Sequence, residues 1–248
     1  MSVLKTSRKY HKWLMLFLGL QFVVWSVTGA YMVFFNIDYI HGDTLIVNHQ
    51  NKVNPTNINF SQQQLFERYP DAKNVELDLF IDREVYRFSQ NKKKYLVAAN
   101  NGKQLSPLSE GEAVKAAKHF YTGSGVVESV EFIKDNPPFE LSRRVYSDLP
   151  AWRVNFDDLG SPALYISATN GKLLGKRHNF WRLFDYMFNF HAMDYIDGAI
   201  DNWLLFWTAL FGLFASITGL ILMYFRVFKS DQDILDANET EMTVKEAL

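Results

Sequence analysis

Histidines are the residues of this chain best suited to carry chemistry, because a neutral imidazole binds transition metals and transfers protons near neutral pH. There are six of them: His11, His41, His49, His119, His178 and His191. The chain has no cysteine, which excludes thiolate metal sites and disulfides. Neither an HExxH zinc motif nor a glycine-rich nucleotide loop occurs. What the histidines do therefore depends on the elements that hold them.

Two uncharged apolar segments, residues 13–35 and 203–225, predict transmembrane helices. At a rise of 1.5 Å per residue, each spans about 34 Å, which is enough to cross the hydrocarbon core of a bilayer. The first is too long for the apolar part of a cleaved signal peptide, and apolar residues continue after Gly29. We therefore interpret it as a retained anchor.

Charges beside these segments predict the topology. Basic residues precede the first helix between Lys5 and Lys12 and follow the second from Arg226. The positive-inside rule therefore places residues 1–12 and 226–248 in the cytoplasm and the intervening region on the other side. The C-terminal segment is acidic, and we expect it to be a solvated, partly disordered tail. The net charge of −1 gives no argument for binding nucleic acid.

The region between the two apolar segments repeats itself. The segment YLVAANNGKQL (95–105) matches LYISATNGKLL (164–174), and each contains an Asn-Gly pair that predicts a tight turn. A capping box at Ser109 and Glu112 marks the start of a helix in the second copy. We predict two repeats of helix, strand, strand and strand, at about 58–105 and 109–174, each burying one sheet face against its helix. The predicted helices and upstream strands are 61–69, 75–81 and 85–90, then 109–121, 126–133 and 151–156.

This order of parts resembles the PepSY-associated transmembrane proteins, a bacterial family. The resemblance rests on the two repeats and on three flanking segments, RKYHKWLMLFLGL (8–20), FNFHAMDYIDG (188–198) and TGLILMYFR (218–226). It implies an α+β membrane protein of the inner membrane, in which two transmembrane helices flank a periplasmic PepSY-like domain. The domain would cover residues 36–179, and an amphipathic juxtamembrane segment would follow at 180–202.

Larger members of this family include four-helix, di-haem reductases of ferric siderophores. The resemblance therefore implies haem b, bis-histidine ligation and electron transfer toward the periplasm. This chain departs from those members in having two predicted transmembrane helices instead of four. Because cofactor sites in bundles usually draw on about four helices, two helices favour a homodimer or a helical membrane partner.

The resemblance assigns haem ligation to His11 and His191, which lie beside the two helices at opposite membrane faces. In a C2 dimer each of them would face its own copy, giving one haem in each leaflet. A rival arrangement pairs His191 with His41 in one chain, because DYIHG (38–42) resembles DYIDG (194–198) at the same membrane face. The residues alone also fit an interfacial histidine at His11 and an amphipathic anchor around His191.

The two apolar segments share a signature, SVTG at Ser26 to Gly29 and SITG at Ser216 to Gly219. Small residues let helices approach closely in lipid, so we interpret these faces as packing surfaces. The alternative is that they admit a flat haem. We expect both motifs near the middle of the bilayer, since each serine lies 13 residues after the start of its segment and the helices run antiparallel. The threonine hydroxyls can bond the preceding turn and so need no other partner.

The remaining polar residues give weaker signals. His49 and His178 lie in polar sequence surroundings, and His119 lies on a predicted helix, so we expect no site at these three. A basic cluster suggests either capture of an anionic substrate or contact with lipid headgroups. Its members are Lys172, Lys176, Arg177 and Arg182.

The expected function is that of a haem b electron-transfer subunit, passing electrons across the inner membrane toward a periplasmic acceptor such as a ferric iron complex. The chain shows no flavin or nicotinamide motif, so a separate flavin or NAD(P)H reductase would supply the electrons. The alternative is a non-catalytic, membrane-anchored PepSY module that binds or regulates a periplasmic partner or assists assembly of a membrane complex. The sequence does not decide whether the protein is an enzyme.

Overall fold

The structure is a computed structural model that describes residues 3–49, 52–138, 140–141, 143–195 and 202–246, with only the backbone at 3–4, 143–144 and 229–246. The chain divides into two compact units. We call residues 1–34 and 185–248 the helix unit and residues 35–184 the domain.

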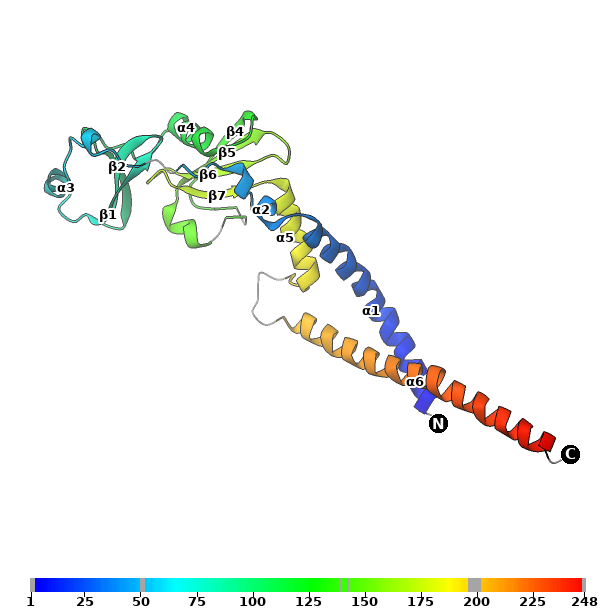
Figure 1. Ribbon diagram of the computed structural model, residues 1–248. Helices are drawn as coiled ribbons and strands as arrows, with labels where there is room; N and C mark the ends of the chain where they lie inside the picture. Colours follow the sequence, from blue (N-terminus) through cyan, green and yellow to red (C-terminus); the bar gives the residue numbers. More distant parts are fainter. Residues whose placement is uncertain (1–2, 50–51, 139, 142, 196–201, 247–248) are drawn as a thin grey trace. The chain divides into compact units, whose positions relative to one another are not determined.

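Three helices contribute to the helix unit: α1 (Val3–Phe34), the end of α5 (Asn179–Ala192) and α6 (Trp203–Glu246) (Figure 1). The two long helices run antiparallel, since His11 contacts Thr218 while Phe17, further along α1, packs edge-on against Phe211. The stretches Lys5–Phe34 and Trp203–Phe228 are long and apolar enough to cross a membrane.

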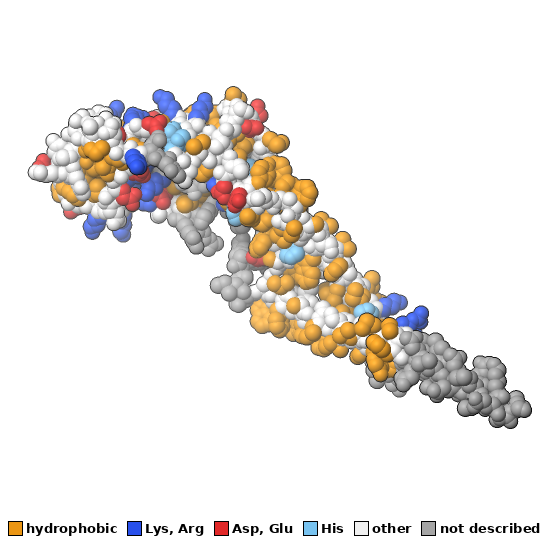
Figure 2. Space-filling model, in the orientation of Figure 1, with side chains coloured by type: hydrophobic (Ala, Val, Ile, Leu, Met, Phe, Trp, Pro, Cys, Tyr) orange, Lys and Arg blue, Asp and Glu red, His pale blue; other side chains and the backbone are white. Residues whose placement is uncertain are grey.

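The surface of these helices fits lipid. Only 6% of the most apolar stretch of α1 and 11% of that of α6 is buried. Neither helix is therefore the core helix of a soluble protein. Figure 2 shows hydrophobic side chains covering α1 and the part of α6 whose side chains are described.

Both long helices exceed the predicted spans. α1 begins at Val3, so the basic segment before residue 13 is helical. Lysine and arginine are good helix formers, and no glycine or proline precedes Gly19, so nothing separates this segment from the apolar one. The backbone of α6 is helical through Glu246, and the expectation of a partly disordered acidic tail is wrong up to that residue.

The domain contains two antiparallel sheets, each preceded by a helix. In the first half, α3 (Gln62–Arg68) precedes β1 (Lys73–Phe80), β2 (Arg83–Gln90) and β3 (Lys93–Ala98). In the second half, α4 (Glu110–Phe120) precedes β4 (Val126–Ile133), β5 (Ala151–Asp157), β6 (Ala163–Ser167) and β7 (Leu173–Arg177). Strands that follow each other along the chain are neighbours in each sheet. Shorter helices are α2 (Ile37–Ile40) and the 3-10 helices Asp43–Leu45, Pro55–Asn57 and Arg143–Asp148.

The two halves correspond in register and in capping. Arg87 on β2 pairs with Leu96 on β3, as Arg153 on β5 pairs with Tyr165 on β6. The capping box predicted at Ser109 is confirmed, and α3 begins with another, formed by Ser61 and Gln64. The order helix, strand, strand, strand therefore occurs twice, and the assignment of these halves to PepSY repeats stays a prediction.

β7 is a strand that the predicted repeat does not contain. The sequence repeat ends at Leu174, whereas β7 continues to Arg177 and pairs with β6. In the first half, the same place holds an isolated bridge between Val97 and Gln104. Pro107 follows there, and a proline has no N–H with which to extend a ladder.

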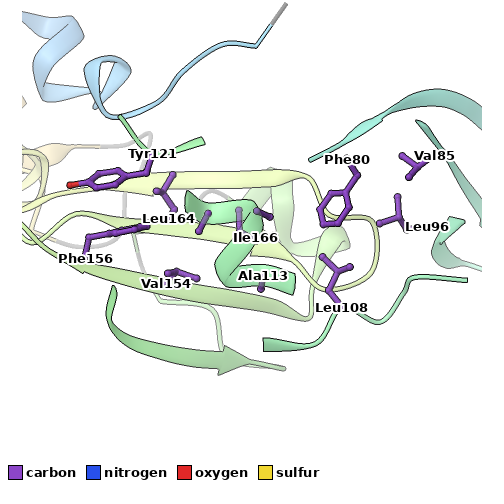
Figure 3. Packing of buried hydrophobic residues seen from close by; sticks show 12 residues of the cluster. Phe80, Val85, Leu96, Leu108, Ala113, Tyr121, Val154, Phe156, Leu164 and Ile166 are labelled. Atoms are coloured by element: carbon purple, nitrogen blue, oxygen red, sulfur yellow. The ribbon is translucent and has the colours of Figure 1, made fainter. Parts of the chain in front are cut away.

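One apolar cluster joins the two sheets and α4 (Figure 3). The second Asn-Gly turn reaches into it, because Gly171 has φ +69° and a Cβ there would lie 2.7 Å from the Phe80 ring. Beside it Arg87, which is 6% exposed, donates from Nε to the carbonyl oxygen of Asn170 at 2.8 Å. The two halves thus share one core and fold as one domain.

Candidate functional site

His11 lies on α1 and packs against a threonine and a glycine of α6. Its Nδ1 is 3.1 Å from the carbonyl oxygen of Ala215 and 3.1 Å from Oγ1 of Thr218. A Cβ on Gly219 would lie 3.1 Å from Cε1 of the imidazole, so a side chain there would push the ring away. We call Thr218 and Gly219 the α6 seat.

His191 makes the reciprocal contact, from the end of α5 onto α1. Its Nδ1 is 3.0 Å from Oγ1 of Thr28, and a Cβ on Gly29 would lie 3.4 Å from its Cε1. Trp25 donates from Nε1 to the backbone carbonyl of His191 at 2.7 Å, which ties this end of α5 to α1. We call Thr28 and Gly29 the α1 seat.

The backbone after His191 holds the histidine in place. Met193 has φ +53°, a left-handed conformation that ends α5. Asn202 then forms hydrogen bonds with two helices. Its Nδ2 donates to the carbonyl of Ala192 at 2.7 Å, and its Oδ1 accepts from the N–H of Leu205 at 2.9 Å. The end of α5 is therefore bonded both to α1, through Trp25, and to the start of α6.

The contacts of the two seats bear on the tautomer of each imidazole. The carbonyl of Ala215 can only accept, so Nδ1 of His11 must carry the proton. When the hydroxyl of Thr28 donates to the carbonyl of Val24, at 2.7 Å, its oxygen is left to accept from Nδ1 of His191. A neutral ring with its proton on Nδ1 has its lone pair on Nε2, and no hydrogen bond of Nε2 is found for either histidine among the described residues.

The seats lie far apart, and the expectation that both motifs meet near the middle of the bilayer is wrong. His11 and Thr28 are 17 residues apart on α1, which corresponds to about 25 Å along the helix. The antiparallel pairing of α1 with α6 sets Thr218 level with His11, so the α6 seat lies at the other end from the α1 seat. SITG therefore contacts His11 at one end of the helix unit, and SVTG contacts His191 at the other end.

The roles within the motifs also differ from those expected. The threonine hydroxyls do bond the preceding turn, Thr28 to Val24 and Thr218 to Phe214 at 3.1 Å, but each oxygen also binds a histidine. Ser26 is exposed and bonds the carbonyl of Phe22 within its own helix. The packing interpretation therefore applies to the threonine and glycine of each motif.

The sequence of the chain matches a known protein family. A family model described as the PepSY-associated TM region matches residues 8–238. The chain belongs to the PepSY-associated transmembrane family. No curated protein and no solved structure was found to match the chain. The match covers both long helices and the domain between them, so the chain is a membrane protein of this family.

The third predicted ligand of this PepSY-associated transmembrane protein is His41. It follows α2 in the domain, is exposed, and lies beside Trp181 with ring centroids 5.1 Å apart. The contacts of His191 belong to the helix unit, so its pairing with His41 stays a prediction. The sequence similarity that suggested it extends to residues 196–198, which lie outside the described residues.

The remaining histidines of the PepSY-associated transmembrane protein are in the domain. The expectation of polar surroundings is wrong for His178, which is 2% exposed, donates from Nε2 to the carbonyl of Tyr39 and packs against its ring. Burial lowers the pKa of His178, so it stays neutral. His49 and His119 stack with ring centroids 3.9 Å apart. Among the described residues, no group of three or more histidines and carboxylates has the geometry of a metal site.

The basic cluster that suggested anion capture is largely neutralised. Lys172 pairs with Glu76 at 3.0 Å, Lys176 pairs with Asp43, and Arg182 pairs with Glu140 at 2.7 Å. The hydrogen bond from Lys176 lowers the pKa of Asp43, which keeps that pair ionised. The fourth member, Arg177, stacks over the ring of Trp181 at 3.7 Å. This pairing weakens the case for an anionic substrate at the cluster.

Proposed function

We propose that the protein is a haem b electron-transfer subunit of the bacterial inner membrane, which passes electrons toward a periplasmic acceptor such as a ferric iron complex. The observation that carries the proposal is the pair of histidine seats at the two ends of the helix unit. Their separation of about 25 Å along α1 approaches the roughly 30 Å thickness of the hydrocarbon core.

The residues present fit the needs of a haem iron. An iron ligand needs a neutral imidazole with a free lone pair, and its other nitrogen is usually held by a hydrogen-bond acceptor. Thr28 provides this acceptor for His191, and Ala215 with Thr218 provides it for His11. Haem would be held by Nε2 of each histidine, and it would supply one-electron transfer between ferric and ferrous iron.

The second ligand of each iron must come from elsewhere in the assembly. We propose a homodimer, in which a second copy brings its own His11 and His191. The α1 seat and the α6 seat support this arrangement. In each, the glycine lets one side of the imidazole pack against a helix, and the other side can face a second chain. A separate flavin or NAD(P)H reductase would supply the electrons.

An absorption spectrum of the purified, haem-replete protein tests the proposal. We expect a red preparation that shows the sharp α-band of reduced haem b after dithionite. A control chain with both His11 and His191 replaced by alanine should be colourless. A stable but colourless native protein would instead favour the alternative, a membrane-anchored module that binds or regulates a periplasmic partner.

The proposed direction of electron flow requires both termini in the cytoplasm and the domain in the periplasm. The motivation is the basic flank from Lys5 to Lys12 and the basic Arg226 after the second span. A phosphatase reporter inserted at Lys103, within the domain, should be active, since this enzyme folds only in an oxidising compartment. The same reporter fused after Leu248 should be inactive, and activity in the reverse order would refute the topology.

A further inference from the structure

A cavity of about 440 Å³ lies in the domain, between its two halves. The β2–β3 hairpin and the segment from Gln104 to Pro107 form one wall, and residues near the start of β5 form the other. Cavities of this size commonly hold small-molecule ligands, and junctions between substructures are a preferred place for them. No part of the proposed haem site contributes to it.

The charge of this cavity is one-sided. Lys92, Lys93 and Lys94 contribute to its lining, and no aspartate or glutamate does. Lys94 is neutralised by Asp148, whose carboxylate lies 2.6 Å from Nζ. Lys92 and Lys93 are exposed, and neither forms an ion pair with any described residue. Two lysines of the lining therefore lack an anionic partner among the described residues, unlike Lys172, Lys176 and Arg182 of the basic cluster.

The turn that carries these lysines has a strained backbone, with positive φ angles at two residues that are not glycine. The hairpin turn consists of Asn91 at φ +50° and Lys92 at φ +63°, a geometry in which glycine is normal at the second position. The preceding hairpin has the same geometry, with Ile81 at φ +48° and Asp82 at φ +58° in the corresponding positions. Lys92 is exposed, as is Asp82 at the same position of the preceding turn. A strained lysine at the rim of a cavity is a reason to look for function there.

Contacts within the domain hold two residues of the cavity lining, Tyr95 and Ser106. Tyr95 stacks on Phe88 with ring centroids 5.3 Å apart. Ser106 accepts from the N–H of Leu96 through Oγ at 3.0 Å. Apolar surface from Leu149 and neutral polar groups such as the hydroxyl of Thr169 complete the lining. This combination offers hydrogen bonds and apolar contact in addition to positive charge.

We propose that this cavity binds a small organic anion with two or more carboxylate groups, held by the ammonium groups of Lys92 and Lys93. Two carboxylates match the two unpaired lysines, while the carbon skeleton contacts Tyr95 and Leu149. The site is independent of haem and adds a ligand-binding role to the domain.

Isothermal titration of the full-length protein in detergent with tricarballylate tests the proposal. We expect saturable binding that weakens at least tenfold in the variant Lys92→Gln with Lys93→Gln. Acetate at matched ionic strength should bind weakly in both proteins. Because both lysines are exposed, the variant should keep the unfolding temperature of the native protein.

Two further variants distinguish a site from general charge attraction. Lys115→Gln with Lys118→Gln removes the same charge from exposed positions of α4 outside the cavity, and binding should be retained. Lys92→Arg with Lys93→Arg should restore most of the affinity. The proposal is overturned by the absence of saturable binding to the native protein, or by equal loss in the two glutamine variants.

Discussion

Replacing His11 by alanine should remove about half of the haem from a haem-replete preparation, because the proposed C2 dimer would hold one haem at each end of the helix unit. The seats support one ligand position per end, His11 at Thr218 and His191 at Thr28. His191→Ala should remove the complementary half, and the double variant should remove all of it. The measurement is the molar ratio of haem to protein after extraction of the haem.

The rival arrangement makes a different prediction for the same variants. If His41 and His191 share one iron within a chain, His11→Ala leaves the haem content unchanged, while His41→Ala and His191→Ala each remove it. His49→Ala is a suitable control in both cases, since His49 is exposed and lies in the domain. Haem content that stays constant in the His11 and His191 variants would contradict both arrangements and favour the binding module.

Local patterns were sufficient to predict the parts of the fold that depend on local physics. Alternating polarity and the Asn-Gly pairs predicted strands, and the structure has β4 at Val126–Ile133, as predicted. The capping box at Ser109 was readable because its two partners lie three residues apart in the chain. The helices of the domain were predicted to within one residue at each end, as α3 and α4 show. The bounds of the two long helices were predicted less well, since composition marks where a helix becomes apolar and gives no sign of where it begins or ends.

The seats could not be predicted in this way, because each joins residues that are far apart in the chain. His11 and Thr218 are separated by 207 positions, and the antiparallel pairing of two helices alone brings them together. A signal was present, however. Trp13 and Trp203 each lie 13 residues before the serine of SVTG or SITG, so the two helices share one pattern. Because the two helices share this pattern, a side chain that packs on the Thr-Gly pair of one helix is expected to have an equivalent on the other helix.

The inter-half contacts of the domain were missed for the same reason. Arg87 lies in the strand predicted at 85–90, and its burial beside the carbonyl of Asn170 had no sign in that pattern. The cavity at Lys92 depends on how the two halves meet, and no single segment contains it. Sequence patterns therefore predicted the elements, whereas the sites arise from the pairing of elements.

Replacing Gly219 by leucine should displace His11 and remove the haem that His11 would hold in the proposed dimer, as completely as His11→Ala would. A Cβ at this position would already lie 3.1 Å from Cε1 of the imidazole, and leucine adds three further carbons in the same place. Overpacking of this kind costs about 1–3 kcal/mol when the surroundings resist, so the ring or the helix must move. Haem content and the reduced spectrum measure the result.

Gly212→Leu is the matched control, because Gly212 lies on the same helix and a Cβ there meets nothing within 4 Å. It adds the same apolar volume to α6 and should leave the haem content unchanged. Gly29 and Gly19 form the corresponding pair on α1, with a Cβ contact of 3.4 Å at Gly29 and none at Gly19. Since 3.4 Å is an ordinary contact, Gly29→Ala should be tolerated, whereas Gly219→Ala should already weaken haem binding.

A second measurement separates displacement of the ring from separation of the helices. The chain has no cysteine, so spin labels on Leu16→Cys and Leu213→Cys, both exposed, report the distance between α1 and α6 without interference. If only the imidazole moves, Gly219→Leu lowers the haem content while this distance stays constant. A lengthened distance would mean that the seat also holds the helices together. Haem binding that is equal in the Gly219 and Gly212 variants would show that the α6 seat does not position His11 for the iron.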